Sequence, residues 1–291
     1  MTTLPSVPPP SPRRRKASGT RNLYYAVCLV LMVLFLFPVT WAFLNSLKTP
    51  QESMASPPTL WPSQFTLSGY EQLLRSAPGV AQSIINSLIV AVMTIVGAVT
   101  LSLLGGYGFA RFHFPGRDAV FVAILLALMI PFQSVLTPLF LILKALHLNN
   151  TLLGLALVYI TFQLPFATFL MRNSFQSVPL AIEEAALIDG AGPFVLLTRV
   201  MLPMVFPGVI TVALFAFFNS WNEFIAALIF QSDVEHYTLP VMLLSATSGA
   251  YGTINWNIIQ AGMVISMLPC ALLFLLLQRY YLSGLTAGAV K

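Results

Sequence analysis

The stretch EEAALIDGAGPFVLLTRVMLP, from Glu183 to Pro203, decides how this chain of 291 residues is read. The whole chain has nine acidic residues. Three of them, Glu183, Glu184 and Asp189, fall within the first seven positions of the stretch. Long apolar runs lie on both sides of it. The contrast indicates a polar surface element between apolar segments.

The overall composition is that of a membrane protein. The chain is 57% hydrophobic and 8% charged, whereas about a quarter of the residues of a soluble domain are charged. A soluble core of this size could not hide so much apolar surface. The net charge of +5 comes from short tails and loops beside apolar runs, so it indicates topology and not nucleic-acid binding. Cys28 and Cys270 lie inside apolar runs, which excludes a disulfide framework or a CxxC metal site.

Six apolar runs are long enough to cross a membrane. A bilayer core is about 30 Å thick, and a helix needs about 20 apolar residues to cross it. We therefore predict an all-α polytopic membrane protein with six transmembrane helices. The expected spans are residues 23–43, 84–110, 119–143, 152–171, 209–230 and 258–281. Residues 22–291 would form one six-span domain, and the Pro- and Arg-rich residues 1–21 a disordered cytoplasmic head.

The basic residues set the expected orientation, because cytoplasmic loops carry an excess of Lys and Arg. Eleven of the 14 basic residues lie on one side of the six spans: Arg13, Arg14, Arg15, Lys16, Arg21, Arg111, Arg117, Arg172, Arg199, Arg279 and Lys291. Lys48, Arg75 and Lys144 lie on the other side. This distribution predicts that both termini and the loop 172–208 are cytoplasmic.

Helix signals divide the acidic stretch into two short helices. Pro179 suits the first turn of a helix, where its missing N–H costs nothing. Good helix formers follow from Leu180 to Ile188, and Asp189-Gly190 is expected to stop the helix because glycine adopts positive φ. A second helix is expected from Pro193 to Leu202. Pro203 would end it, because the residue before a proline disfavours the α region.

The acidic helix has two possible surroundings. An amphipathic hairpin lying on the membrane is one, but an acidic helix fits it poorly because the inner leaflet is negatively charged. A docking surface for a soluble cytoplasmic protein fits better. Glu183 and Glu184 lie in the early turns, where negative charge meets the positive end of the helix dipole. Ala185 and Ala186 make one patch small enough for another surface to approach closely.

The same stretch resembles a known loop. Glu184-Ala185-Ala186, three residues, Gly190, nine residues, Val200, one residue and Leu202-Pro203 is similar to the EAA loop of permease subunits of ABC importers, with Val where Ile is common. The fuller form EEAALIDGAGPF…LP…P resembles the sugar-importer branch, and specifically the six-span, maltose-transporter-type subunit. Further motifs agree in order: NSLK at 45–48, NSL at 86–88, GYGFARFHFPGR at 106–117, WNEF at 221–224 and GLTAGAVK at the end. The resemblance runs from about residue 23 to residue 291.

The resemblance implies partners and roles. It implies a multi-pass protein of the cytoplasmic membrane of a prokaryote, assembled with a second permease subunit, two ATPase domains and an extracytoplasmic sugar-binding protein. ATP and Mg²⁺ would be bound by the ATPase partner, so this chain would need no cofactor. In the family the first helix of the loop is a coupling helix. The ATPase-coupling residues would be Glu184, Ala185, Ala186, Asp189, Gly190, Leu202 and Pro203, with Glu184 pairing with a basic residue of the ATPase.

Polar side chains inside the spans indicate a second site. Ionisable groups within a bilayer are costly and usually functional, and Glu223 is such a group. Helical spacing would place Asn219, Asn222, Glu223 and Ala226 on one face, and Gln133 and Gln163 lie in other spans near prolines. These amides and carboxylates could line a sugar pathway. They could equally be polar contacts between helices, including contacts with the second permease.

The chain carries no pattern for chemistry of its own. It lacks GxxxxGK[ST] and HExxH, and its three histidines lie in different loops, which argues against a nucleotide site or a metal site. We therefore expect no intrinsic enzyme activity, and the resemblance implies a permease role in an ATP-driven sugar importer. A permease for another solute, such as a peptide or polyol phosphate, and a membrane scaffold without a pathway remain the alternatives.

Overall fold

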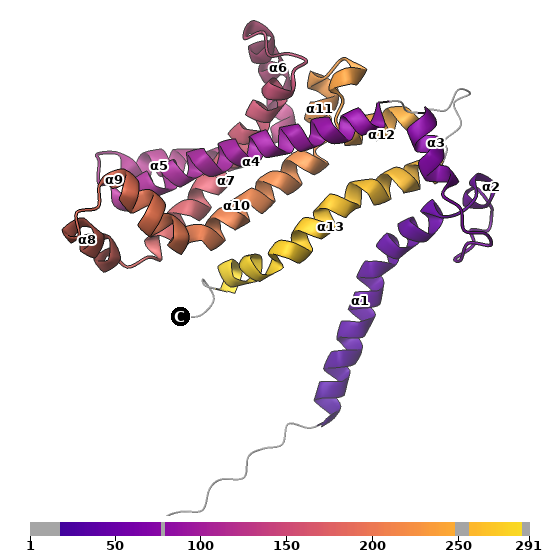
Figure 1. Ribbon diagram of the computed structural model, residues 1–291, viewed down its shortest axis with the longest axis horizontal. Helices are drawn as coiled ribbons and strands as arrows, with labels where there is room; N and C mark the ends of the chain where they lie inside the picture. The colour runs from indigo at the N-terminus through magenta and orange to yellow at the C-terminus, as the bar shows by residue number, and fades with distance from the viewer. Residues whose placement is uncertain (1–17, 77–78, 248–255, 287–291) are drawn as a thin grey trace, which may run out of the picture.

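The structure is a computed structural model that describes residues 18–76, 79–247 and 256–286, and every regular element within these residues is helical (Figure 1). Five helices or continuous helical segments are long and apolar enough to cross a membrane. They are α1 (Ser18–Ser46), α4 (Val80–Arg111), α7 (Leu152–Gln176), the segment Pro193–Asn222 that ends in α10 (Leu202–Asn222), and α13 (Trp256–Thr286). The predicted all-helical, polytopic architecture is confirmed.

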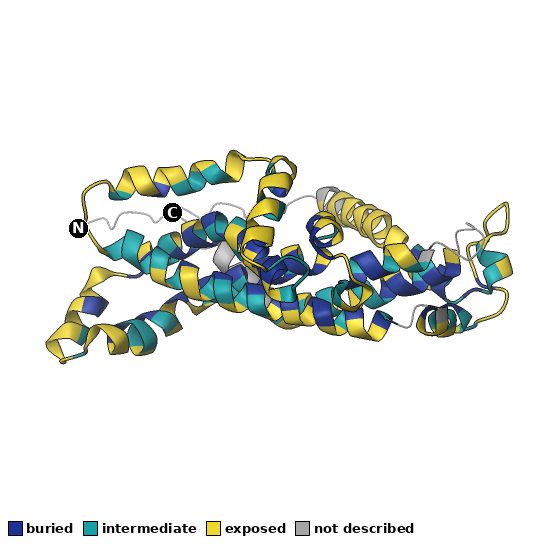
Figure 2. Ribbon diagram, turned by 90° about the horizontal axis from the view of Figure 1, so that it is seen from above, coloured by how far each residue is buried: buried dark blue, intermediate teal, exposed yellow. Residues whose placement is uncertain are grey.

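Helices α4, α7 and α10 run side by side as the centre of the bundle, and α13 lies along α10 (Figure 1). Buried residues concentrate where these helices meet (Figure 2). In the apolar window of α7, 44% of the residues are buried, but in that of α1 only 6% are. Helix α1 contacts α13 and otherwise extends away from the bundle (Figure 1), so its apolar surface is left for lipid or a partner helix.

The span expected at residues 119–143 is not one straight helix. It consists of α5 (Arg117–Leu126) with the 3₁₀ turn η1 (Ala127–Met129), followed by η2 (Phe132–Val135) and α6 (Leu136–Ala145). The two halves are bent by 97°. The break falls at Ile130, whose ψ of 118° is extended, because a residue before proline disfavours the α region. The six-span prediction holds only when this bent pair is taken as one span.

The start of the span expected at residues 209–230 also differs from the prediction, because the helix begins before residue 209. The two-helix prediction is correct for α8 (Leu180–Ile188) but wrong for the second helix, which does not stop at Pro203. The chain continues through α9 (Pro193–Val195) and the π-helical turn η3 (Leu196–Met201) into α10. Pro203 lies in the first turn of α10, where a missing N–H costs nothing.

The far end of the same predicted span is broken. Helix α10 ends at Asn222, Glu223 is extended with ψ of 132°, and a separate helix α11 (Ile225–Phe230) follows. The predicted common face of Asn219, Asn222, Glu223 and Ala226 is therefore wrong, because the four residues do not belong to one helix.

Smaller helices occupy the end of the bundle remote from α8 (Figure 1). They are α2 (Pro50–Ser53), α3 (Ser68–Ser76), η4 (Val234–His236) and α12 (Leu239–Thr247). Helix α1 begins at Ser18, inside the predicted head 1–21. Residues 1–17 of that head and residues 287–291 of the C-terminal motif lie outside the described residues.

Candidate functional site

Helix α8 protrudes at one end of the bundle (Figure 1). Pro179 is its N-cap, and Gly190 ends it with φ of +83°, a conformation that glycine adopts without a Cβ penalty. The N–H groups of Asp189, Gly190 and Ala191 donate to the last carbonyls of α8. The local signals thus produce the predicted helix and stop.

The outer face of α8 is open. Glu184, Ala185 and Asp189 are exposed, and Leu187 and Ile188 are 55% and 86% exposed. Exposed apolar side chains beside acidic ones, at the tip of a protruding helix, are suited to contact with another protein. Ala186 is half-buried and packs against the chain's own core. Of the two alanines, Ala185 is the one available to a partner.

The remaining predicted coupling residues, Leu202 and Pro203, lie at the start of α10. Helix α8 contacts η3, the π-helical turn that directly precedes them. Leu202 is half-buried and Pro203 is exposed. These two residues therefore lie where the chain re-enters the bundle. Glu184 and Asp189 form the exposed acidic surface of α8.

The inner face of α8 carries a contact that the sequence did not reveal. Glu183 is 8% exposed and its carboxylate forms an ion pair with the guanidinium of Arg111, at the end of α4. The Nη2 atom of Arg111 also donates to the carbonyl of Val178, at 2.8 Å. The sequence indicates a position at the helix dipole for Glu183 and a cytoplasmic location for Arg111, but no contact between them.

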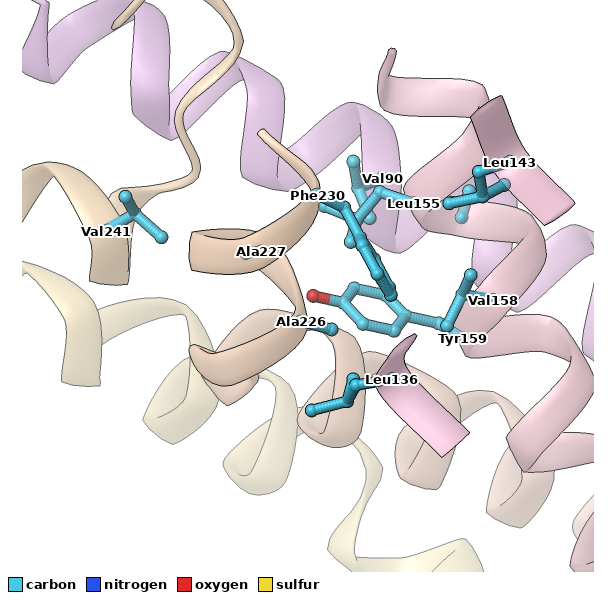
Figure 3. Packing of buried hydrophobic residues seen from close by; sticks show 11 residues of the cluster. Val90, Leu136, Leu143, Leu155, Val158, Tyr159, Ala226, Ala227, Phe230 and Val241 are labelled. Carbon is cyan, nitrogen blue, oxygen red and sulfur yellow. The ribbon is translucent and has the colours of Figure 1, made fainter. Parts of the chain in front are cut away.

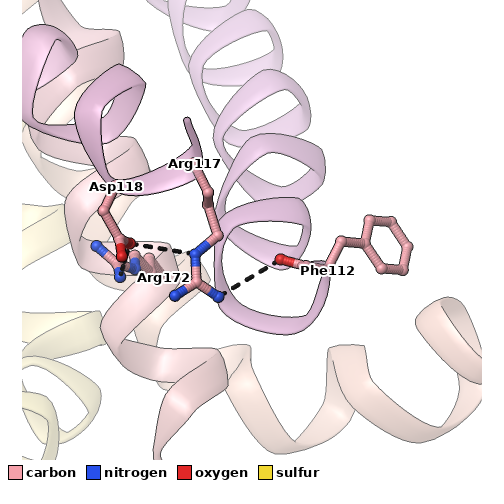
Figure 4. A network of polar contacts seen from close by, with 4 residues as sticks. All are labelled: Phe112, Arg117, Asp118 and Arg172. Atoms are coloured by element: carbon pink, nitrogen blue, oxygen red, sulfur yellow. Dashed lines mark hydrogen bonds and ion pairs between the residues drawn. The ribbon is translucent and has the colours of Figure 1, made fainter. Parts of the chain in front are cut away.

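A second, more exposed ion-pair network lies nearby (Figure 4). Asp118 accepts from Arg117 at 3.1 Å and from Arg172 at 3.4 Å. The Asp118 side chain is 70% exposed, so the pairs are screened by solvent. The network connects α5 with α7, and the Arg172 guanidinium lies over the Phe121 ring at 4.0 Å.

The polar residues of the spans form a separate cluster in the middle of the bundle. The Nδ2 atom of Asn219 donates to Oε1 of Gln163, at 2.7 Å between α10 and α7. Gln163 is 5% exposed, and its Nε2 atom is buried without a hydrogen-bond partner among the described residues. A buried amide donor without a partner is costly, and this atom is unsatisfied in the described part of the chain.

Glu223 belongs to the same region. Its Oε2 accepts a hydrogen bond from the Tyr159 hydroxyl, at 2.6 Å. Its carboxylate also accepts from the backbone N–H groups of Ala226 and Ala227 at 3.0–3.2 Å. These bonds satisfy the start of α11 and explain why the chain leaves α10 at this residue. Tyr159 lies among the buried residues of one hydrophobic cluster, beside Ala226 (Figure 3), and was missed by sequence analysis.

Two predicted pathway residues lie outside this contact set. The Nδ2 of Asn222 donates to the carbonyl of Phe218 in its own helix, at 2.8 Å, and is exposed. Gln133 is exposed on η2, and no hydrogen bond joins it to Gln163, Asn219 or Glu223 in the described part of the chain. The structure brings together Gln163 with Asn219, and Glu223 with Tyr159.

The family model of the binding-protein-dependent transport system inner membrane component matches residues 98–286. The chain belongs to this family. The match includes α8, the polar cluster, and the ion pair of Arg111 and Glu183. Membership in this inner membrane family agrees with the apolar helices of the structure, and the protein is a multi-pass permease component.

Curated relatives cover nearly the whole permease chain. It is 35% identical to the sulfoquinovosyl glycerol transport system permease protein SmoH of Agrobacterium fabrum, over 93% of this chain and 94% of the relative. It is 36% identical to the trehalose transport system permease protein SugB of Mycobacterium tuberculosis, over 93% and 98%. It is 32% identical to the diacetylchitobiose uptake system permease protein DasC of Streptomyces coelicolor, over 90% and 94%.

Among solved structures, the permease fold matches a bacterial ABC transporter involved in the import of the acidic polysaccharide alginate. The TM-score is 0.77 at 21% identity, covering 93% of this chain and 100% of that chain. The likeness confirms the predicted ABC-importer permease fold.

Proposed function

We propose that this permease is a membrane-spanning subunit of an ATP-driven importer of a sugar or glycoside. The observation that carries the proposal is the set of relatives at 32–36% identity over at least 90% of this chain, whose names give sulfoquinovosyl glycerol, trehalose and diacetylchitobiose. All three names denote molecules with sugar units rich in hydroxyl groups. The permease would form half of the translocation pathway.

In this proposal the energy comes from partners. A second permease completes the pathway, two ATPase domains bind ATP and Mg²⁺, and a binding protein delivers the solute from outside. Both termini and α8 lie on the cytoplasmic side, in agreement with the distribution of Lys and Arg. The exposed surface of Glu184, Leu187, Ile188 and Asp189 suits contact with an ATPase.

The polar cluster suits the passage of a polyhydroxylated solute. The Nε2 donor of Gln163 is unpaired among the described residues, and the Asn222 amide is exposed at the end of the neighbouring helix α10. Amides exchange hydrogen bonds with hydroxyl groups at little net cost. A solute could therefore move from one such group to the next without strong binding at any of them.

Co-purification from the native host with a C-terminal tag, followed by reconstitution in lipid, tests the function. We expect two ATPase copies and a second permease to co-purify, and one sugar of a panel, added with the binding protein, to stimulate ATP hydrolysis. Stimulation by a peptide or a polyol phosphate and by no sugar would contradict the sugar assignment. Purification without any ATPase would favour a scaffold.

A pair of variants tests the pathway. Asn222→Leu should assemble normally but lose most transport, because it replaces an exposed amide with an apolar group. Thr161→Val is the matched control, since among the described residues the Thr161 hydroxyl donates to the Leu157 carbonyl of its own helix, at 2.8 Å. Normal transport by Asn222→Leu would contradict the placing of this residue in the pathway.

A further inference from the structure

The contact between Arg111 and Glu183 joins three segments at one point. Arg111 lies in the last turn of α4, and Glu183 in the first turn of α8. The second hydrogen bond of Arg111 goes to Val178, between the end of α7 and the start of α8. One guanidinium therefore holds the ends of α4 and α7 and the beginning of α8.

The surroundings make this contact stiff. The side chains of Arg111 and Glu183 are only 8% and 10% exposed, so water cannot readily replace either partner. Tyr107 packs edge-on against Phe175 at 5.2 Å and against Phe112 at 5.6 Å in the same region. The planar guanidinium presents its donors in a fixed fork, which sets the direction of α8 and not only its distance from α4.

Both charges also suit their helices. A cation in the last turn of α4 and an anion in the first turn of α8 each face the favourable end of a helix dipole. The pair is consequently not a chance meeting of flexible side chains. Its geometry is specified by two helix ends, by the Val178 carbonyl, and by the apolar residues around them.

A continuous packed route leads from this contact to the polar cluster. Met171, Phe175 and Ala167 of α7 pack in one buried cluster with Ala98 of α4 and with Val212 of α10. The same helix α7 carries Gln163 and Tyr159 farther along. Closely packed helices move as bodies and not as independent segments.

We propose that Arg111 and Glu183 are positioning residues that fix coupling helix α8 to α4 and α7, so that a displacement of α8 by the ATPase moves the helices that carry the polar cluster. The inference depends on the proposed function, since it assigns to this contact the transmission of ATPase motion. Glu184 faces the ATPase, whereas Glu183 faces the permease's own helices. Of these two adjacent acids, Glu184 would connect α8 to the ATPase, and Glu183 connects α8 to the rest of the permease.

The test uses the complete importer in lipid, with transport and ATP hydrolysis measured on the same samples. The variants are Arg111→Glu, Glu183→Arg, the exchanged pair carrying both changes, and the milder Arg111→Lys. Arg117→Gln is the matched control, because it removes an arginine from the exposed network of Asp118, a few residues along the chain. Hydrogen exchange of residues 178–190 reports whether α8 is held in place.

We expect each single charge reversal to lower the number of solute molecules moved per ATP about tenfold, within the range of typical coupling between sites, and to speed exchange in α8. The exchanged pair should restore part of both readouts, because the ion pair forms again but each charge then faces the unfavourable end of a helix dipole and the Val178 carbonyl loses its Arg111 donor. Arg111→Lys should give an intermediate loss. Arg117→Gln should change neither. Rescue of transport by the exchanged pair is not expected from a loss of packing alone.

Three results would overturn the inference. One is a normal transport-to-ATP ratio in a single reversal that assembles. Another is a normal ratio in Arg111→Lys, which decides the matter if the reversals do not assemble. The third is an exchanged pair that regains slow exchange in α8 but not coupling. Failure of the proposed function would be a separate result, in which no sugar stimulates ATP hydrolysis by the unaltered importer.

Discussion

Two adjacent acids of α8 lie in opposite environments, one on the buried inner face of the helix and one on its exposed outer face. Glu183 and Glu184 are neighbours in the chain, but their side chains project about 100° apart around the helix. Glu183 is 8% exposed and paired with Arg111. Glu184 is exposed and takes part in no ion pair within the described residues.

The difference separates stability from partner binding. A buried charge must keep its partner, because the loss of one partner leaves the other uncompensated in an apolar setting. An exposed carboxylate is solvated and costs nothing until another protein covers it. Substitutions on the inner face should therefore act on the folded permease itself, and substitutions on the outer face on the assembled importer.

Glu183→Ala should give the largest loss of stability. Removal of one partner of a buried ion pair costs about 3–5 kcal/mol, because Arg111 would remain buried with the Val178 carbonyl as its hydrogen-bond partner among the described residues. Thermal unfolding of the purified protein in detergent, followed by tryptophan fluorescence, measures the effect. Unfolding at the temperature of the unaltered protein would show that the pair contributes no net stability.

Gly190→Ala should have the second-largest effect, and it acts on both faces together. The φ of +83° at Gly190 is costly for a residue with a Cβ, although the site has open space around it. The expected cost is about 1–2 kcal/mol, with a matching shift in the orientation of α8. Gly192→Ala is the control, because Gly192 has open space and an ordinary φ of −70°. Equal melting temperatures for the two variants would contradict this explanation.

Tyr159→Phe extends the comparison to a third glutamate. Glu223 is half-buried, whereas Glu183 is buried, and Glu223 is held by a hydroxyl and two backbone N–H groups in place of a cation. Loss of the hydroxyl leaves the backbone bonds in place, so we expect a loss of about 1 kcal/mol, typical of polar contacts between membrane helices. Unfolding in detergent measures it, and a loss as large as that of Glu183→Ala would contradict the ranking.

The inner and outer faces also differ in what the sequence could predict. The ends of α8 follow from Pro179 and Gly190, because each acts on its own backbone. The exposed acidic surface then follows from the motif spacing. The partner of Glu183 could not be predicted, since Arg111 is 72 positions away and only the packing of α4 beside α8 brings them together.

Hydropathy located the spans but not their breaks. Apolar residues resume directly after Glu223, in FIAALIF at 224–230, so hydropathy extends the span past the end of α10. The carboxylate of Glu223 ends the helix by accepting N–H bonds from the next turn, a local competition that periodicity cannot detect. At Pro203 a predicted helix end is absent. The residue before a proline usually disfavours the α region, but the π-helical turn before Pro203 lets the helix continue through it.

Glu184→Ala should have the smallest effect on stability and is the sharpest test of the comparison. We expect unfolding within about 0.5 kcal/mol of the unaltered protein, as for most exposed substitutions, together with weaker binding of the ATPase or weaker coupling to it. A charged hydrogen bond across an interface contributes about 1.5–3 kcal/mol, so the affinity for the ATPase should fall by about tenfold or more. Co-purification at increasing salt and sugar-stimulated ATP hydrolysis measure this loss. Normal uptake and normal stimulation in this variant would show that the outer face of α8 does not depend on Glu184, whereas a lowered melting temperature would show that the two faces are not separate.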